Sequence, residues 1–378
     1  MTMRYRLFGR SGLRVSELAL GTMTFGTDWG WGADQQECQR MLDAYGEAGG
    51  NFIDTACNYT DGASERIVGE LVAADRDHWV LATKYGLTGR PDDPNAGGNH
   101  RKNLQRTLEA SLGRLGTDHL DLLWLHMWDG MTPVEEVVRT LDDAVSAGKV
   151  LYVGVSDTPA WVVARAVTMA ELRGWAPFTG LQVPWSLADR AVEREHLPLA
   201  AALDLAVTPW GLLEGGELTG KYLTTAQPAG GAVLDRGDRA SEPTRSRPDD
   251  VSPRVNDLAR EVLAVAEGLG RPAAQVAINW VRQQDFGCPI VPIVGARSAE
   301  QLRANLGCLD FELEPELLAR LSAASGFQLG FPRSFLESDH VRGLIFGETF
   351  ALTDDHRRGR GHPSRAAASR SPAGSSAR

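Results

Sequence analysis

A short apolar run is followed by a carboxylate and a phenol in the sequence Asn51-Phe52-Ile53-Asp54-Thr55-Ala56-Cys57-Asn58-Tyr59. The apolar pair Phe52 and Ile53 leads directly to Asp54, and Tyr59 follows five residues after that. This pattern is typical of a buried strand that opens into a loop. We therefore predict that Asp54 and Tyr59 lie just past the carboxyl end of a strand.

Two later segments end in the same way. Residues 79–83 form an apolar run that precedes Lys84, and residues 120–125 form another that precedes His126. In a (β/α)₈ barrel the carboxyl ends of all strands meet at one mouth, where the active site is built. One acid, one phenol, one ammonium and one imidazole are thus expected to converge there.

The rest of the chain alternates between strand and helix patterns. Such alternation predicts βαβ units and a parallel sheet, and hence an α/β protein with a (β/α)₈ TIM barrel over residues 1–350. The Gly-rich turn at 9–12 predicts an N-terminal β-hairpin. Expected strands lie at 18–22, 52–53, 79–83, 120–125, 150–155, 180–183, 205–208 and 289–294, with helices at 34–48, 104–115, from 132, from 158, at 255–269 and at 273–284.

Three segments carry local signals. Thr132-Pro133-Val134-Glu135 predicts a capping box with proline at the first helical position. A long polar loop is expected at 224–253, between strands seven and eight, because it is rich in Gly, Pro, Asp and Arg. Residues 351–378 are rich in Arg, Ser and Pro, which predicts a disordered tail whose basic residues are read as a solvated extension.

Composition narrows the class of protein. The chain has 378 residues, of which 43% are hydrophobic and 23% charged, and a formal net charge of −10, which disfavours nucleic acid or an anionic membrane as partner. Its cysteines are scattered without metal-ligand spacing, so we expect reduced thiols and no metal. No signal-peptide pattern and no run of about 18 apolar residues is present, which favours a cytoplasmic protein. The cysteines are Cys38, Cys57, Cys288 and Cys308.

The set Asp54, Tyr59, Lys84 and His126 resembles the catalytic tetrad of the aldo-keto reductases. Residues 154–161 and 125–129 are most similar to the aryl-alcohol dehydrogenase-like branch. A phenol with a pKa of about 10 is a reluctant acid at neutral pH, and a neighbouring ammonium stabilises the phenolate. The resemblance implies that Tyr59 is the general acid, assisted by Lys84, with Asp54 pairing Lys84 and His126 orienting the substrate oxygen. It also implies that the hairpin closes the bottom of the barrel.

No Gly-x-Gly-x-x-Gly motif follows a strand, so a Rossmann cofactor site is not supported. The resemblance implies instead that NADP(H) lies across the top of the barrel. Arg297 at a helix start suits a phosphate and favours NADPH over NADH, although Ser298-x-x-Gln301 also fits a capping box and both interpretations can hold. The implied cofactor residues are Gly21, Thr22, Asp54, Ser156, Asp157, Gln182, Trp210, Gly211, Leu212, Leu213, Lys221, Gly295, Arg297, Gln301 and Asn305.

The expected function is NADPH-dependent reduction of aldehydes or ketones to alcohols, with a small-molecule carbonyl as substrate and no nucleic acid or membrane as partner. Aromatic residues near the expected mouth favour aryl or bulky apolar substrates, although loop packing explains them equally well. These residues are Trp29, Trp31, Tyr85 and Trp128. Two alternatives stay open: a ketoreductase of sugar or secondary-metabolite biosynthesis, and a non-catalytic NADPH-sensing regulatory subunit. The sequence does not give an oligomeric state.

Overall fold

A computed structural model describes residues 3–223 and 252–353. The predicted loop at 224–253 and the predicted disordered tail at 351–378 lie outside the described residues, apart from their described ends at 252–253 and 351–353. In the described part, no helix is both long enough and apolar enough to cross a membrane.

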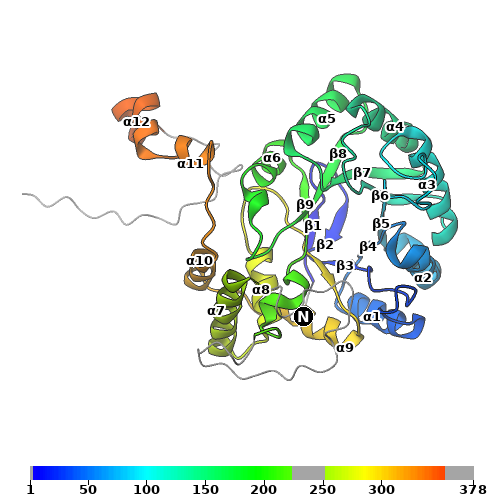
Figure 1. Cartoon of the computed structure of the whole chain (residues 1–378), viewed down its shortest axis with the longest axis horizontal. Coiled ribbons are helices and arrows are strands. Elements are labelled where there is room, and N and C mark those ends of the chain that lie inside the picture. The colour runs from blue at the N-terminus through cyan, green and yellow to red at the C-terminus, as the bar shows by residue number, and fades with distance from the viewer. Residues whose placement is uncertain (1–2, 224–251, 354–378) are drawn as a thin grey trace, which may run out of the picture.

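Eight parallel strands form the barrel, in the spatial order β10-β3-β4-β5-β6-β7-β8-β9 (Figure 1). β10 pairs with β3, and a single bridge between Val207 and Ile290 joins the segment before β10 to β9. The predicted (β/α)₈ barrel is therefore confirmed. The strands are β3 (Ala19–Gly21), β4 (Phe52–Asp54), β5 (Val80–Tyr85), β6 (Leu120–Leu125), β7 (Val150–Ser156), β8 (Phe178–Pro184), β9 (Ala206–Trp210) and β10 (Ile293–Gly295).

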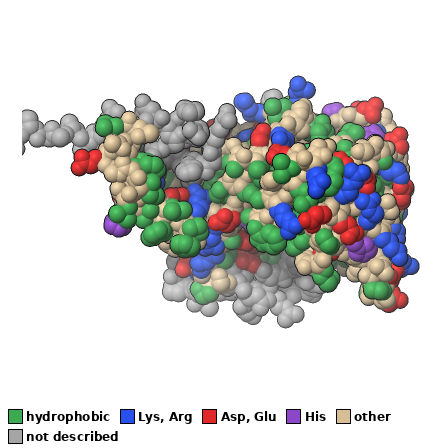
Figure 2. Space-filling model, turned by 90° about the horizontal axis from the view of Figure 1, so that it is seen from above, with side chains coloured by type: hydrophobic (Ala, Val, Ile, Leu, Met, Phe, Trp, Pro, Cys, Tyr) green, Lys and Arg blue, Asp and Glu red, His purple; other side chains and the backbone are tan. Residues whose placement is uncertain are grey.

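Helices surround the strands, and α11 and α12 lie outside this ring of helices (Figure 1), with Arg333 of α11 donating to the backbone oxygen of Glu193 at 3.0 Å. The α-helices are α1 (Gln35–Glu47), α2 (Ala63–Val72), α3 (Arg101–Leu115), α4 (Val134–Ser146), α5 (Ala160–Arg173), α6 (His196–Leu203), α7 (Pro253–Leu269), α8 (Ala273–Arg282), α9 (Ala299–Leu306), α10 (Pro315–Ala324), α11 (Arg333–Leu336) and α12 (Asp339–Phe346). Short 3₁₀ helices include η1 (Tyr59–Gly62), η3 (Ala191–Glu193) and η4 (Glu214–Thr219). Acidic and basic side chains are interspersed on the face shown in Figure 2.

The barrel has separate inner and outer cores. The outer core lies between strands and helices, and the inner core fills the barrel with side chains that include Phe8, Phe52 and Trp124. Two glycines make room for the inner aromatic rings. A Cβ at Gly154 would lie 2.3 Å from the Trp124 ring, and one at Gly180 would lie 2.6 Å from the Phe8 ring.

An antiparallel hairpin of β1 (Tyr5–Leu7) and β2 (Arg14–Ser16) closes the end of the barrel where the strands begin. Phe8 follows β1, and its ring packs edge-on against Phe52 and Trp124 with centroid distances of 5.6 and 6.2 Å. The predicted hairpin and its position are confirmed.

Two local predictions are wrong. Strand eight begins at Ile293 and not at residue 289, because Pro289 and Pro292 have no N–H for a strand ladder. The capping box at Thr132 does not form: α4 starts after Pro133, and the Thr132 hydroxyl donates to Asp129 Oδ2 at 2.6 Å. The other oxygen of Asp129 accepts from the backbone N–H groups of Met131 and Thr132, so Asp129 holds the chain just before α4.

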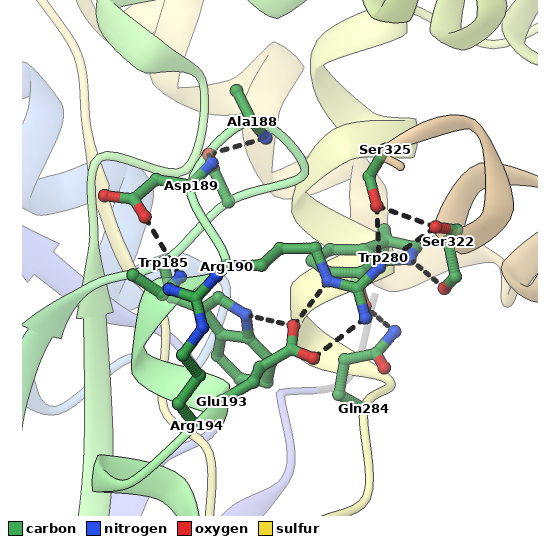
Figure 3. Close-up of polar contacts among 12 residues, drawn as sticks. Trp185, Ala188, Asp189, Arg190, Glu193, Arg194, Trp280, Gln284, Ser322 and Ser325 are labelled. Atoms are coloured by element: carbon green, nitrogen blue, oxygen red, sulfur yellow. Dashed lines mark hydrogen bonds and ion pairs between the residues drawn. The ribbon is translucent and has the colours of Figure 1, made fainter. Parts of the chain in front are cut away.

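The loop that follows β8 is fixed by a polar network (Figure 3). Arg190 donates to both carboxylate oxygens of Glu193, at 2.6 and 2.8 Å, and to the backbone oxygen of Ser322 at 3.0 Å. The indole of Trp185 donates to the same Glu193 carboxylate at 3.0 Å. This network joins η3 to the end of α10 and holds one side of the open mouth in place.

Candidate active site

Lys84 contacts two of the other three predicted catalytic residues. Its Nζ lies 2.5 Å from Asp54 Oδ2 and 3.0 Å from the Tyr59 hydroxyl, and it also donates to the backbone oxygen of Thr55 at 2.9 Å. Lys84 and Asp54 are 1% and 2% exposed, whereas Tyr59 is half-buried. A buried ammonium thus sits between a buried carboxylate and the phenol of a half-buried tyrosine.

The pKa values follow from these contacts. Burial tends to lower the pKa of Lys84, but Asp54 and Tyr59 outweigh it and raise the pKa to about 12. Burial raises the pKa of the Tyr59 phenol, and the Lys84 ammonium acts in the opposite direction. Lys84 is therefore charged at neutral pH. Its positive charge favours the phenolate form of Tyr59 and so eases loss of the Tyr59 proton.

His126 completes the cluster from the end of β6. Its ring meets the Tyr59 ring edge-on with a centroid distance of 6.2 Å. Burial, and then the charge of Lys84, lower the pKa of His126 to about 3, so the ring is neutral at physiological pH. Its Nδ1 is buried and has no hydrogen-bond partner among the described residues. A neutral imidazole can orient a carbonyl oxygen without competing for the Tyr59 proton.

The turn after Tyr59 has a strained backbone. Thr60 and Asp61 both have positive φ values, of 44° and 53°, which residues with a Cβ rarely adopt. Two side-chain contacts hold the turn: the Thr60 hydroxyl donates to the backbone oxygen of Phe25 at 2.6 Å, and the Trp29 indole donates to Asp61 at 3.2 Å. These contacts hold the backbone directly after Tyr59, and the sequence pattern did not reveal Thr60 or Asp61.

Three polar side chains lie in register on adjacent strands beside the cluster. Ser156 pairs with Gln182, and Gln182 pairs with Thr208. Gln182 donates to Asp54 Oδ1 at 3.0 Å, while the buried hydroxyls of Ser156 and Thr208 have no partner among the described residues. Buried polar groups are normally satisfied, so these hydroxyls fit a site for a polar ligand such as a carboxamide. Sequence reasoning missed Thr208, although its place at the end of a strand is the same signal that identified Ser156.

The last residue of β9 and the segment after it carry the next group of predicted cofactor residues. Trp210 is 41% exposed, and its indole donates to Asp157 Oδ1 at 3.3 Å. Gly211 has a φ of 74°, Leu212 is buried in the core, and Leu213 is partly buried. Lys221 Nζ donates to the backbone oxygen of Gly215 at 2.9 Å. Trp210 thus offers an exposed ring, whereas Leu212 can offer only its backbone.

The start of α9 holds the predicted phosphate residues. Ser298 is the N-cap and accepts from the N–H of Gln301 at 3.1 Å. Gln301 accepts from the N–H of Arg297 at 2.9 Å, so the capping interpretation is confirmed for Ser298, with Gln301 reaching one residue further back than in a standard capping box. Gly295 is exposed, and Asn305 is buried with its amide 3.5 Å from the Gly295 oxygen.

Thr22 directly follows β3, the first strand of the barrel. It is fully buried, and its hydroxyl donates to the backbone oxygen of Asp54 at 3.0 Å. A Cβ at neighbouring Gly21 would lie 2.7 Å from the Ile293 side chain. Both residues therefore support the base of the site through packing and backbone contacts, and Thr22 has no exposed side chain for a ligand.

The predicted aromatic residues separate into different environments. Trp29 and Trp31 are half-buried, with ring centroids 5.7 Å apart, and Trp31 lies under the Arg297 guanidinium at 5.1 Å. Trp128 is half-buried, and its backbone N–H donates to the backbone oxygen of Asp157 at 3.4 Å. Tyr85 is fully buried in the outer core, so its predicted role in substrate contact is wrong. It alternates with Lys84 along β5 and therefore points away from the barrel interior.

A cavity of about 670 Å³ lies beside the Tyr59 turn. It is lined by Cys57, Asn58 and Asp61 on one side and by the loop after β5 and α3 on the other, and none of the four catalytic candidates lines it. The cavity therefore lies next to the Tyr59 turn and outside the cluster formed by the four catalytic candidates.

Comparison with known proteins agrees with this geometry. The model of the aldo/keto reductase family matches residues 17–325. The chain therefore belongs to the aldo-keto reductase family, and it is an oxidoreductase.

Its relatives place it within the family. It is 38% identical to a norsolorinic acid reductase of Aspergillus flavus, over 87% of this chain and 83% of that protein. It is 37% identical to an aryl-alcohol dehydrogenase [NADP(+)] of Phanerodontia chrysosporium, over 85% of each chain. A putative aryl-alcohol dehydrogenase of Saccharomyces cerevisiae is 34% identical, over 89% of this chain and 90% of that protein. The predicted aryl-alcohol dehydrogenase-like branch is confirmed.

Proposed function

We propose that this protein reduces aldehydes or ketones, with aryl or other bulky apolar groups, to alcohols at the expense of NADPH. The observation that carries the proposal is the buried ammonium of Lys84 in contact with both Asp54 and the Tyr59 hydroxyl. That arrangement serves one purpose well: it stabilises a phenolate at a place that a substrate can reach.

Each residue of the cluster has a separate role in the proposed reaction. Tyr59 holds the proton at its hydroxyl and donates it to the carbonyl oxygen, and Lys84 stabilises the phenolate that remains. Asp54 keeps Lys84 charged and in place, and Gln182 in turn holds Asp54 Oδ1. His126 donates a hydrogen bond to the same carbonyl oxygen and orients it. NADPH, when bound, supplies the hydride.

The described residues fit this cofactor. The unpartnered hydroxyls of Ser156 and Thr208 suit the carboxamide, and the exposed ring of Trp210 suits the nicotinamide face. The backbone from Gly211 to Leu213 and the Lys221 ammonium suit the pyrophosphate. Arg297, Ser298 and Gln301 suit the 2′-phosphate, with Gly295 and Asn305 beside the adenine.

Substrate choice rests on the residues around the mouth. Trp29, Trp31 and Trp128 supply half-buried aromatic surface, and one relative is named as an aryl-alcohol dehydrogenase. The relatives named for norsolorinic acid support a second candidate, a ketoreductase that acts on one ketone of a biosynthetic pathway.

A panel of aromatic aldehydes, aliphatic aldehydes and ketones, read by NADPH consumption, tests the proposal. Turnover of aryl aldehydes across the panel supports the first candidate, and selective turnover of a bulky ketone supports the second. Tight NADPH binding with no consumption on any carbonyl would contradict both and favour the regulatory subunit.

Arg297→Ala is expected to weaken NADPH binding by about tenfold to a hundredfold and to leave NADH binding nearly unchanged. A charge-assisted contact is worth about 1.5 to 3 kcal/mol, and each factor of ten in affinity is about 1.4 kcal/mol. NADH has only a hydroxyl at that position. Dissociation constants for both dinucleotides measure the effect.

Ser298→Ala provides the comparison. It removes the N-cap and is expected to cost about 1 kcal/mol in the free energy of unfolding. If Arg297→Ala lowers the affinities for NADPH and NADH equally, Arg297 does not contact the 2′-phosphate.

A further inference from the structure

The carboxylate of Glu37, from the first turn of α1, lies at the start of α9. Its Oε1 accepts from the backbone N–H of Ala299, the first residue of α9, at 2.5 Å. Arg40, one turn further along α1, contacts the other oxygen of Glu37. The Glu37 side chain is 20% exposed. A residue far away in the sequence therefore brings a negative charge to the positive end of this helix.

The neighbouring N–H groups at this helix start are also satisfied from within the protein. Gln301 N–H donates to the Ser298 hydroxyl, and Arg297 N–H donates to the Gln301 side chain. Among the three side chains that accept from these N–H groups, those of Glu37, Ser298 and Gln301, only Glu37 is ionised. The hydrogen bond from Ala299, and then Arg40, lower the pKa of Glu37, so it is charged at neutral pH.

We propose that Glu37 occupies the anion position at the start of α9 to which the 2′-phosphate of NADPH is assigned, so that Glu37 opposes NADPH binding and sets the preference between NADPH and NADH. This inference rests on the proposed function. A phosphate at this helix start must either displace the carboxylate from Ala299 or lie beside a like charge.

NADH meets no such obstacle. Its ribose carries a 2′-hydroxyl, which can donate a hydrogen bond to a carboxylate, the same contact by which acidic residues select NADH at other dinucleotide sites. Arg297 and Glu37 therefore act in opposite directions on the same atom group. The preference for NADPH is smaller than Arg297 alone would produce.

Glu37→Gln tests the inference. Gln keeps a side-chain oxygen that can accept from Ala299, and it removes the charge together with the oxygen that accepts from Arg40. The variant is expected to bind NADPH about tenfold more tightly, a change of about 1.4 kcal/mol, and to bind NADH equally well or more weakly. Dissociation constants for both dinucleotides, measured by quenching of tryptophan fluorescence, report the effect without any turnover.

Glu47→Gln is the matched control. Glu47 lies on the same helix and forms an ion pair of 3.9 Å with Arg303 of α9, but it does not contact the start of α9. The substitution removes the same charge from α1, and neither dissociation constant is expected to change. A second variant, Glu37→Ala, also removes the acceptor for Ala299, and a gain in NADPH affinity in both Glu37 variants would assign the effect to charge.

The possible failures are distinct. If wild-type protein binds neither dinucleotide, the proposed function is wrong and this inference falls with it. If NADPH binds and depends on Arg297, but Glu37→Gln leaves the ratio of the two dissociation constants unchanged, the proposed function stands and the role of Glu37 is wrong. The same holds if Glu47→Gln tightens NADPH binding as much as Glu37→Gln does.

Discussion

Tyr59→Phe is expected to lower the rate of carbonyl reduction by about 10²- to 10⁴-fold, the usual contribution of a positioned general acid. The ring stays in place, since its edge contact with His126 does not depend on the hydroxyl. The variant loses the proton donor and the hydrogen bond that the hydroxyl accepts from Lys84. The initial rate of NADPH oxidation with an aromatic aldehyde measures the change.

The dissociation constant for NADPH is the control for this variant, and it is expected to stay near the wild-type value. Loss of both binding and turnover would instead point to a disturbed turn at Thr60 and Asp61, where the positive φ values make the backbone sensitive. Turnover near the wild-type rate would show that Tyr59 is not the proton donor.

Lys84→Met is expected to lower the free energy of unfolding by about 3 to 5 kcal/mol, as well as to remove activity. The variant leaves the Asp54 carboxylate at 2% exposure with no opposite charge, and breaking a buried ion pair from one side costs about this much. Urea denaturation measures the loss, because the denaturation midpoint falls with stability at an unchanged slope.

Two further variants make this result specific. In the double variant Asp54→Asn/Lys84→Met no buried charge is left unpaired, so a large part of the lost stability is expected to return. Lys149→Met breaks the exposed ion pair with Glu109 and is expected to cost at most about 1 kcal/mol. Equal losses for Lys84→Met and Lys149→Met would show that burial of the Lys84 pair is not what makes it costly to break.

The sequence was sufficient to predict the barrel and the meeting of the catalytic candidates at its mouth, because both depend on local patterns. Each of Asp54, Lys84 and His126 stands at the end of an apolar run, and parallel strands bring such ends together. The alternation of side chains along a strand explains why Tyr85 was wrongly predicted to contact the substrate. If Lys84 points into the barrel, the next side chain must point out of it.

Contacts between distant segments could not be predicted in this way. Glu37 reaches Ala299 only because α1 packs against α9, and no spacing within either segment records that packing. The backbone of Thr60 is similarly determined by a contact with Phe25, not by its own preference. At Thr132 a local motif was present, but α4 starts after Pro133 without a side-chain cap, and the Thr132 hydroxyl donates to Asp129.

The hairpin that plugs the barrel with Phe8 has a practical consequence. Because β1 and β2 lie at the end where the strands begin, a support or fusion partner joined near the start of the chain would face away from the mouth. An immobilised catalyst made in that orientation would keep its entrance free for reagents.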